Sequence, residues 1–269
     1  MPRRVRRAVA LLVQKLLAKT PYALVESADL LRAECLLNWN QALLADRLTK
    51  DALPRAQVGQ DLFVLMATSF KRDGFFVEFG AADGVNLSNT FLLERSFGWK
   101  GILAEPARGW HDALAQSREC AIDTRCVWAT SGQTLEFVEA VEPEYSTIRD
   151  MVGLDGGHEA SRAAAAVYDV ATVSLNDLLN AHSAPSSIDY LSIDTEGSEY
   201  EILRAYDFTS REIRIITVEH NFDRVRRSRV YDLLTSHGFR RVLDDMSLWD
   251  DWYVLGSAFP RDGALDRLA

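Results

Sequence analysis

The sequence has few cysteines and no hydrophobic run long enough to cross a membrane. Its 269 residues include three cysteines, Cys35, Cys120 and Cys126, without a CxxC pair. This spacing excludes a structural zinc site and a disulfide scaffold, and so few cysteines are typical of a reducing cytoplasm. The run "AVALLV" near the start is followed at once by Gln14 and Lys15, and it is too short for a bilayer. We therefore expect a cytoplasmic protein.

Acidic residues outnumber basic ones outside the first 20 residues. The net charge is −9, but the opening segment carries six basic residues and no acid, so the remainder carries −15. A body this acidic disfavours nucleic-acid binding, which needs a basic face. The opening segment also places Val5, Val9, Leu12 and Leu16 at helical spacing. It therefore predicts either a helix packed on the body or a peripheral contact with the anionic inner face of a membrane.

The chain does have the composition of a globular α/β domain. Hydrophobic residues make up 48% and charged residues 26% of the sequence, which argues against a disordered chain. We expect a helical extension over residues 1–54 and one domain over residues 55–269. A helix is predicted over residues 57–71, because apolar residues recur every four positions from Val58 to Phe70.

From residue 75 onward, short apolar runs alternate with helical patterns, which predicts a doubly wound α/β sheet covered by helices on both faces. No long crossover separates the last two runs, so they predict an antiparallel hairpin. Two shorter strands are expected at 134–140 and 167–173. The glycine-containing segment 141–166 suits either a mobile substrate loop or a surface excursion. The seven main strands are predicted at 75–79, 101–105, 124–129, 188–194, 213–219, 239–243 and 251–256.

A glycine turn follows the first of these strands in "FFVEFGAADGVNLSNTF". A first glycine allows a sharp turn and a second allows the backbone to approach a ligand, and here these are Gly80 and Gly84. Ala82 occupies the position of the middle glycine of a dinucleotide fingerprint, which disfavours a pyrophosphate ligand. A helix is predicted to begin near Asn86 or Ser88, where its free amides could receive a carboxylate.

An acid ends the second predicted strand. Glu105 lies 27 residues after Glu78. In nucleoside-binding sheets, an acid at this position accepts hydrogen bonds from two ribose hydroxyls. The glycine turn and the acid together predict a nucleoside site, although the same pattern also arises by accident.

Acidic residues also gather at the predicted ends of two later strands. Asp194 and Glu196 follow one strand, and Glu219 and His220 end the other, at the edge where α/β sheets bind ligands. Either His220 serves as a general base, or Asp194, Glu196 and Glu219 hold Mg²⁺. Glu196 also suits the first turn of a helix, and His220 also suits a structural role. His158, in the glycine-containing segment, is the next candidate base.

Together these runs resemble the FkbM family of S-adenosylmethionine-dependent methyltransferases. The resemblance rests on "VEFGAADG", "SLNDLL", "IDYLSIDTEGSEYEIL" and "IITVEHN", and it extends from residue 56 to residue 255. It implies a class I methyltransferase fold, a Rossmann-like sheet of seven strands with an antiparallel final hairpin. Members of the family commonly methylate hydroxyl oxygens of sugars, glycolipids or polyketide products. The resemblance therefore also implies O-methylation of a carbohydrate, glycolipid or related acceptor.

The resemblance further implies roles for individual residues. The methionine part of S-adenosylmethionine would contact the glycine turn, its ribose would contact Glu105, and its adenine would lie near the third strand. Ala56 departs from the family, in which serine is usual, and this leaves the role of the polar residues after it open. The expected catalytic residues are Asp194, Glu196 and His220. The implied cofactor-binding residues are Glu78, Gly80, Asp83, Gly84, Ser88, Asn89, Glu105, Asp123, Trp128, Ala129 and Asp194.

Two other functions stay open at this point. An NAD(P)-linked oxidoreductase would share the nucleoside site, but Ala82 and the final hairpin disfavour it. A methyltransferase-like module without catalysis could dock proteins or membranes through residues 1–54, although the glycine turn and the acids argue against it. Trp249 and Trp252 suit a core, sugar stacking, or an interface with a second copy of the chain, so a homo-oligomer is a further expectation.

Overall fold

The computed structural model describes residues 54–153, 166–244 and 246–259, all within one compact unit, Ala52–Ala269. The predicted membrane-facing segment and His158 lie outside the described residues. No helix in the described part of the chain is both long enough and apolar enough to span a bilayer.

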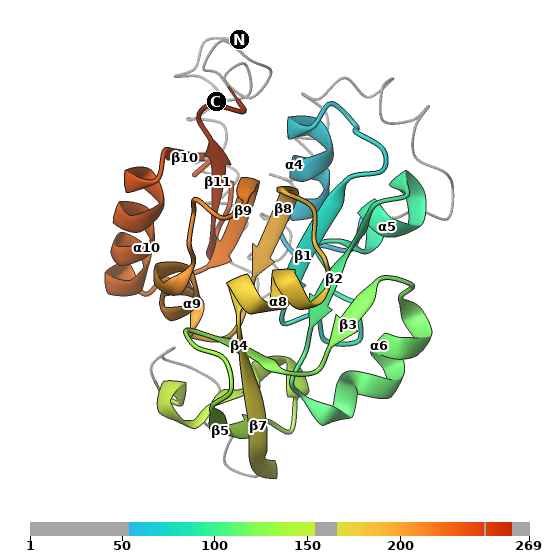
Figure 1. Ribbon diagram of the computed structural model, residues 1–269, viewed down its shortest axis with the longest axis vertical. Coiled ribbons are helices and arrows are strands. Elements are labelled where there is room, and N and C mark those ends of the chain that lie inside the picture. The colour runs from blue at the N-terminus through green and yellow to red at the C-terminus, as the bar shows by residue number, and fades with distance from the viewer. Residues whose placement is uncertain (1–53, 154–165, 245, 260–269) are drawn as a thin grey trace, which may run out of the picture. The chain divides into compact units, whose positions relative to one another are not determined.

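A seven-stranded sheet forms the centre of this unit (Figure 1). Every neighbouring pair in it is parallel except the two pairs that involve β11, which runs against both neighbours. The predicted seven-stranded sheet with an antiparallel final hairpin is therefore confirmed. The strands, in their order across the sheet, are β10 (Phe239–Val242), β11 (Asp250–Leu255), β9 (Glu212–Glu219), β8 (Ser187–Ile193), β1 (Phe75–Phe79), β2 (Lys100–Ala104) and β3 (Ala121–Asp123).

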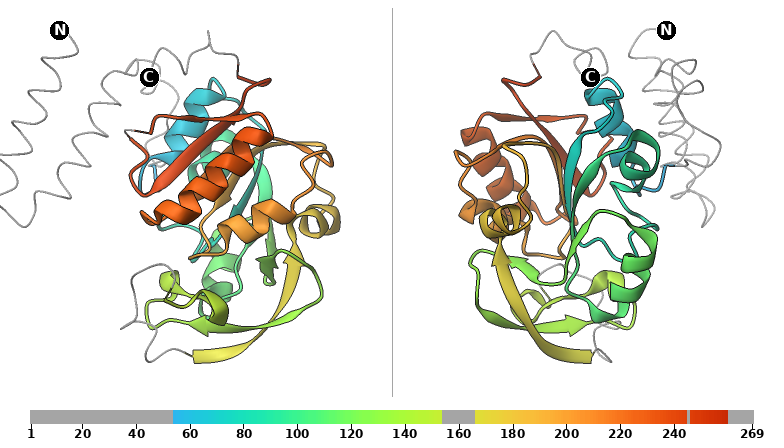
Figure 2. Two further views of the ribbon diagram at one scale, coloured as in Figure 1. Left: turned by 90° about the vertical axis from the view of Figure 1, so that its left-hand side faces the viewer. Right: turned by 45° about the vertical axis from the view of Figure 1, so that its right-hand side comes forward.

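Helices cover both faces of the sheet, as the two views in Figure 2 show. On one face α4 (Gln60–Ala67) packs against α5 (Phe91–Phe97). On the other face α9 (Glu199–Ala205) lies between α8 (Leu175–Ala181) and α10 (Arg224–Ser236). A short helix α6 (His111–Ser117) follows β2, and three 3-10 turns complete the set: η1 (Arg108–Trp110), η2 (Pro143–Tyr145) and η3 (Arg149–Met151).

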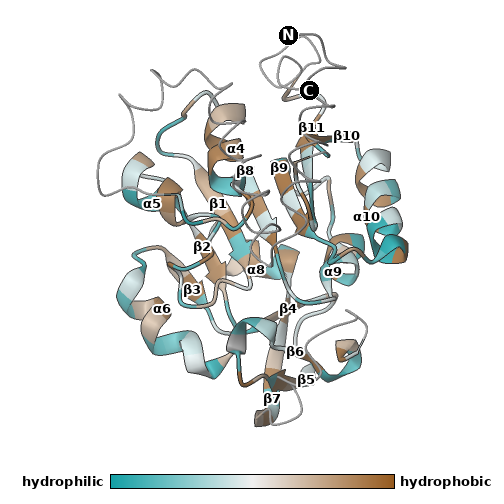
Figure 3. Cartoon of the chain, turned by 180° about the vertical axis from the view of Figure 1, so that it is seen from behind, coloured by the Kyte–Doolittle hydropathy of each residue, from teal (hydrophilic) through white to brown (hydrophobic). Residues whose placement is uncertain are grey.

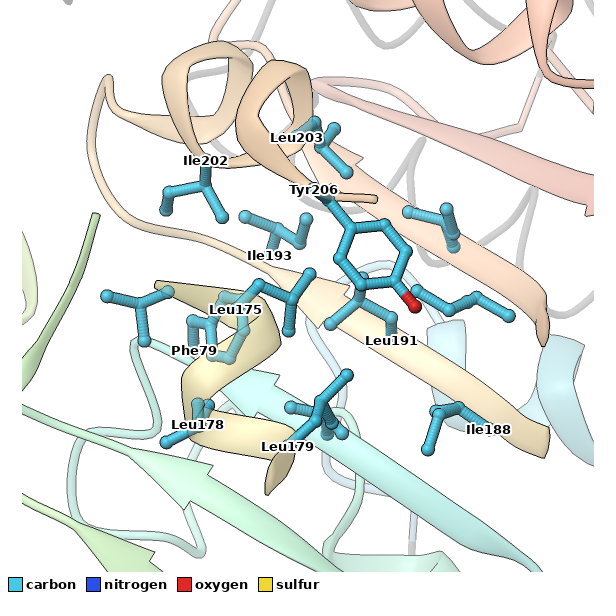
Figure 4. Close-up of a cluster of buried hydrophobic side chains, with 14 of the residues drawn as sticks. Phe79, Leu175, Leu178, Leu179, Ile188, Leu191, Ile193, Ile202, Leu203 and Tyr206 are labelled. Atoms are coloured by element: carbon cyan, nitrogen blue, oxygen red, sulfur yellow. The ribbon is translucent and has the colours of Figure 1, made fainter. Parts of the chain in front are cut away.

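Alternation along β8 builds the larger part of the core. Leu191 and Ile193 pack with apolar residues of α8 and α9, and all of them are buried (Figure 4). Successive strand residues point to opposite faces, so Tyr190 and Ser192 face the other side. There the Tyr190 hydroxyl is 2.8 Å from Oγ1 of Thr217. Each fully buried aliphatic side chain contributes roughly 1.5–3 kcal/mol. In Figure 3 much of the brown colour of hydrophobic residues lies on the strands and on α4, whereas α6 and α10 are mostly white and teal.

The opposite face is closed by aromatic stacking between α4 and β11. The rings of Phe63 and Trp252 are stacked with centroids 4.7 Å apart, and both residues are buried. Trp252 is therefore a core residue rather than a sugar-stacking platform. The predicted helix over residues 57–71 is shorter than expected, since Ser69 and Phe70 adopt positive φ angles that end it.

The prediction of a main strand at 124–129 is wrong. The main sheet contains β3, which ends at Asp123, where Arg125 donates its backbone N–H and two side-chain N–H groups back to the Asp123 carboxylate. This turn takes the chain out of the main sheet. The next strand belongs to a second sheet of four strands, ordered β4 (Cys126–Trp128), β7 (Ala166–Ser174), β5 (Thr134–Glu139) and β6 (Thr147–Ile148). Both shorter predicted strands are present in it.

The helix after the glycine turn begins later than predicted. It starts at Phe91, not near Asn86 or Ser88. Leu87 has a φ of 62°, and Ser88 Oγ accepts the backbone N–H groups of Thr90 and Phe91 at 3.2 and 3.1 Å. These bonds hold the segment before α5 as a turn, because a hydroxyl that accepts nearby amides competes with helix formation.

Candidate functional site

A cavity of about 330 Å³ lies where the main sheet meets the second sheet. It opens beyond the carboxyl ends of β1, β2, β8 and β9, which is where open α/β sheets bind ligands. Its size is at the lower end of the range for small-molecule sites. The residues used below that line it are Gln57, Glu78, Gly80, Ala82, Leu87, Ser88, Asn89, Glu105, Cys126, Val127, Phe137, Glu144, Tyr145, Asp194, Glu196, Glu219, Asn221, Phe222 and Trp249.

Gly80 brings the turn after β1 against the end of β8. A Cβ atom at this position would lie 1.8 Å from the backbone oxygen of Asp194, and its φ is 73°. Its N–H donates to the carbonyl of Ala104 at 3.1 Å. Only glycine fits this space and this backbone conformation. The first glycine of the motif thus joins three strand ends at the cavity.

Asp83 and Gly84 do not line the cavity. Asp83 Oδ1 accepts the backbone N–H groups of Val85 and Asn86, both at 2.8 Å. A Cβ atom on Gly84 would lie 2.6 Å from Cδ1 of Leu114 in α6. The geometry therefore does not support the predicted ligand contacts of these two residues. The second glycine instead lets the turn pack closely against α6.

The Glu78 carboxylate holds the segment that lines the cavity between β1 and α5. It accepts the backbone N–H of Asn89 at 2.7 Å and the hydroxyls of Thr90 and Ser88 at 2.5 and 3.0 Å. Burial raises the pKa of Glu78, and the Arg118 guanidinium, 3.8 Å away and fully buried, opposes that shift. The carboxylate is thus paired, and it positions Ser88 and Asn89 rather than standing free for a ligand.

Glu105 follows β2 and keeps part of its hydrogen-bonding capacity open to the cavity. One oxygen accepts the N–H of Ala82 at 2.9 Å, and the other accepts the N–H of Ala107 at 2.8 Å. Each carboxylate oxygen can accept a second bond. Burial raises the pKa of Glu105 to about 7, against the lowering effect of those two amides. Two remaining acceptor positions on one carboxylate suit the two hydroxyls of a ribose.

Trp128 and Ala129, which the resemblance implies for the adenine beside the third strand, do not line the cavity. Cys126, Val127 and Phe137 line it instead. The error follows from the misassigned third strand, since β4 begins at Cys126 and presents its first residues to the cavity. An apolar wall of this kind suits the flat face of a base.

Asp123 is held by basic side chains outside the cavity. Arg125 Nη2 donates to its carboxylate at 2.6 Å, and His182 Nε2 lies 2.9 Å from it. Burial would raise the pKa of Asp123, but these bonds outweigh it and lower the pKa to about 2. The carboxylate therefore closes the end of β3, and its predicted contact with adenine is not supported.

Asp194, Glu196 and Glu219 come together at the ends of β8 and β9. One carboxylate oxygen from each residue lies within 4.8 Å of the others. Glu219 shares a hydrogen bond with Asp194 and accepts one from Asn221 Nδ2 at 2.7 Å. Burial raises the pKa of Asp194 to about 6. Burial and the two neighbouring carboxylates raise the pKa of Glu219 further. The predicted acidic cluster therefore exists, and its Asp194–Glu219 pair retains one proton near neutral pH.

His220 does not join this cluster. Its Nδ1 accepts the backbone N–H of Phe222 at 3.0 Å, and its Nε2 lies 3.9 Å from Asp251 Oδ1, away from the cavity. Burial lowers its pKa. His220 lies away from the cavity because successive residues along a strand point to opposite faces, and Glu219 points to the cavity side. The prediction that His220 acts on the acceptor is therefore not supported by its position.

The first turn of α9 begins at Glu199 and not at Glu196, and Glu199 is a structural acid. Its Oε1 accepts the N–H groups of Thr195 and Gly197 at 3.1 and 2.9 Å. These bonds fix the turn that carries Glu196, whose φ is 55°. An acid in the first turn of α9 thus stabilises the loop beside the cavity instead of facing a ligand.

Several lining residues had no predicted contact with a ligand, and Trp249, for which sugar stacking was one of three expectations, lines the cavity with them. Gln57 and Trp249 meet across the cavity mouth, where Trp249 Nε1 donates to Gln57 Oε1 at 3.3 Å. Phe222 and Leu87 are 67% and 49% exposed and lie at the same mouth. For Trp249 the sequence did contain a signal, which was the antiparallel hairpin. A reversed strand such as β11 brings its first residues, rather than its last, to this edge of the sheet.

Comparison with known proteins identifies a methyltransferase. The family model described as "Methyltransferase FkbM domain" matches residues 78–241. No curated protein matches the chain.

Solved structures with similar folds include other methyltransferases. Precorrin-6y C5,15-methyltransferase from Geobacter metallireducens is 14% identical, covers 72% of this chain and 76% of its own, and has a TM-score of 0.35. A chain of a fibrillarin/Nop5p complex is 12% identical, covers 77% of this chain and 85% of its own, and has a TM-score of 0.38. Similarities this low give no information about the acceptor.

Proposed function

We propose, from the premise that this chain belongs to the FkbM methyltransferase family, that it transfers a methyl group to a hydroxyl oxygen of a carbohydrate, a glycolipid or a related natural product. The observation that carries the proposal is the Asp194–Glu219 pair beside the glycine turn. A hydroxyl is a poor nucleophile at neutral pH, and an acceptor of its proton is needed where the methyl group arrives.

The usual methyl donor of such enzymes, S-adenosylmethionine, fits the residues that line the cavity. Glu105 offers two acceptor positions for ribose hydroxyls, and Cys126, Val127 and Phe137 offer an apolar wall for adenine. Gly80 lets the turn after β1 pack directly against the end of β8, and this turn lines the part of the cavity where the methionine part would lie. The donor supplies an electrophilic methyl group on a positively charged sulfur.

The chain's own contribution to the chemistry is removal of a proton. As the acceptor oxygen forms its bond to carbon and the carbon–sulfur bond breaks, the hydroxyl proton passes to the negatively charged Asp194–Glu219 pair. A pKa of about 6 at Asp194 keeps the pair able to accept a proton near neutral pH. Activity should therefore rise as the pH passes through about 6, because the pair gains its negative charge there.

A magnesium ion is the alternative for the same three carboxylates. Hard oxygen ligands within 4.8 Å of one another suit Mg²⁺, which would lower the pKa of a bound acceptor hydroxyl. The two possibilities separate in one assay. Activity that survives chelator treatment excludes the metal, and activity that is lost and then restored by Mg²⁺ or Mn²⁺ makes the carboxylates its ligands.

The experiment that tests the proposed function is transfer of a labelled methyl group from S-adenosylmethionine to glycan, lipid and small-metabolite fractions of the source cell. Label should appear in a hydroxyl-bearing product, and its transfer should be strongly reduced in the Asp194→Asn variant. Binding of NAD or NADP in place of S-adenosylhomocysteine would instead favour the oxidoreductase. Binding of S-adenosylhomocysteine without transfer to any fraction would favour the module without catalysis.

Location and partners are further proposals. We propose that the protein is cytoplasmic and does not bind nucleic acid. We also propose a peripheral membrane contact through the basic residues before residue 54, and self-association as a homo-oligomer. The acidic composition of the body supports the exclusion of nucleic acid.

A further inference from the structure

The cavity is lined by acids without a basic side chain among the described residues. Six lining residues carry carboxyl groups, and none of the described lining residues is Arg, Lys or His. Glu78 is paired with Arg118 behind the lining. Glu105, Asp194 and Glu219 form no ion pair with any described residue. Such a site attracts cations and repels anions, because a cleft of low dielectric strengthens the field of its charges.

The acceptor has to bind at the mouth of this cavity. A volume of about 330 Å³ is near the smallest that holds one drug-sized ligand, so a nucleoside joined to an amino acid would occupy most of it. Leu87 and Phe222 are exposed residues of the lining, and Trp249, whose Nε1 donates to Gln57, lines the cavity with them, so these residues border the mouth.

The apolar side chains at the mouth are presented by unusual backbone. Phe222 and Leu87 have φ angles of 59° and 62°, a conformation that costs a residue with a side chain about 1–3 kcal/mol. Hydrogen bonds hold both turns, from the Phe222 N–H to His220 Nδ1 and through the bridge between Ala56 and Leu87. Both residues nevertheless remain exposed, Phe222 more than Leu87.

We infer that this mouth is an acceptor subsite for uncharged or cationic hydroxyl compounds with an apolar face, and that it rejects acceptors that carry a phosphate, sulfate or carboxylate. This inference rests on the proposed function and specifies its substrate class. Phe222, Leu87 and Trp249 pack against the apolar face of the acceptor. The carboxylates at the base of the mouth receive the hydroxyl and repel a negative charge placed next to it.

A matched pair of probes tests the inference by binding rather than by turnover. Phenyl β-glucoside and phenyl β-glucuronide differ in one hydroxymethyl group that becomes a carboxylate. Each is titrated by ligand-observed NMR into the full-length protein saturated with S-adenosylhomocysteine. We expect saturable binding of the glucoside and binding of the glucuronide weaker by about tenfold or more, which corresponds to about 1.4 kcal/mol. Equal binding of the two probes, or binding of neither, overturns the inference.

Two variants with matched controls locate the effect. Phe222→Ala should weaken glucoside binding several-fold, whereas Val225→Ala, which removes an exposed apolar side chain outside the cavity, should leave it unchanged. Glu144→Lys should reduce the ratio of glucuronide Kd to glucoside Kd, because it replaces a carboxylate of the lining by a positive charge. Asp112→Lys, on α6 outside the cavity, should leave this ratio unchanged.

Glucoside preference without methyl transfer to any fraction would remove the proposed function alone. Transfer with equal binding of both probes would remove this inference alone.

Discussion

Four carboxylates at the same edge of the sheet have two different kinds of surroundings. Glu78 in β1 and Glu105 after β2 are buried and accept hydrogen bonds from backbone amides, and Glu78 is also close to a guanidinium. Asp194 after β8 and Glu219 at the end of β9 are partly buried and interact with each other and with one amide group. Hydrogen bonds stabilise a carboxylate as an anion, whereas a neighbouring carboxylate destabilises it. The first pair therefore holds the turns around the cavity through its amide partners, whereas the second pair shares a proton between its two members.

Replacing one member of the second pair should have the largest effect. Asp194→Asn should lower kcat by about 10²–10⁴-fold, because the pair then lacks the carboxylate that accepts the acceptor's proton. Binding of S-adenosylhomocysteine should persist, and so should the fold, since the change removes a repulsive charge. Asp112→Asn, on α6 outside the cavity, is the matched control. An Asp194→Asn enzyme with the parent's kcat would remove the pair from the mechanism.

Replacing the first member of the other pair should affect stability instead. Glu78→Ala should lower the free energy of unfolding by about 3 kcal/mol, because it leaves Arg118 buried with one fewer carboxylate partner. Urea unfolding measures this difference. The control is Glu119→Ala, since that side chain is 84% exposed and its pair with Arg95 contributes little. Equal stability of the two variants would show that Glu78 does not hold the turn.

The pH dependence of donor binding should depend on Glu105. Its pKa of about 7 lies above the ordinary glutamate value, so the ionised form is gained as the pH rises through 7. S-adenosylhomocysteine should therefore bind more tightly at pH 8 than at pH 6. Glu105→Gln should remove this dependence and weaken binding at pH 8 by about 1.5 kcal/mol, roughly tenfold.

The effect of pH on the free energy of unfolding through Glu105 has the opposite sign to its effect on donor binding. The free protein loses stability as pH rises from the pKa of Glu105 in the unfolded chain to about 7, because an ionised Glu105 is disfavoured by burial.

The predicted pH dependence of donor binding is measured by calorimetric titration of S-adenosylhomocysteine into the parent and the Glu105→Gln variant at several pH values. Glu136→Gln on β5, where the side chain is 52% exposed, serves as the control. A Glu105→Gln variant that keeps the parent's pH profile would exclude Glu105 from the donor site.

The smallest effect is expected at His220. Asn can accept the Phe222 N–H in place of Nδ1, so His220→Asn should keep the turn after β9 and lower kcat by well under about tenfold, below the contribution of a general base. A loss of 100-fold or more in steady-state assays, with donor binding intact, would instead restore His220 as the base.

The sequence predicted the features that depend on strand order. The glycine turn, Glu105 and the three clustered acids each follow a strongly apolar strand, and the ends of parallel strands meet at one edge. The site could therefore be assembled from the positions of β1, β2, β8 and β9 along the chain. The antiparallel hairpin was equally visible, because too few residues separate β10 from β11 for a crossover.

Features that depend on single residues could not be predicted in this way. The turn that Arg125 makes around Asp123 ends β3 two residues before β4 begins, and apolar periodicity does not reveal it. His220 and Glu219 are adjacent in sequence, so only the face on which each side chain lies separates their roles. The packing role of Gly84 could not be predicted without the position of α6, because Leu114 of that helix occupies the space where a side chain at residue 84 would lie.

The reversed direction of β11 has a consequence for how such a protein can evolve. Asp250 pairs with Glu219, so the residues that enter β11 reach the cavity edge that the other strands reach on leaving the sheet. Trp249 thereby meets Gln57, 192 positions earlier in the chain. Mutations in the segment before β11 can change the mouth while every residue that follows β1 and β2 stays the same. Selection can therefore act on the choice of acceptor without disturbing the recognition of the methyl donor.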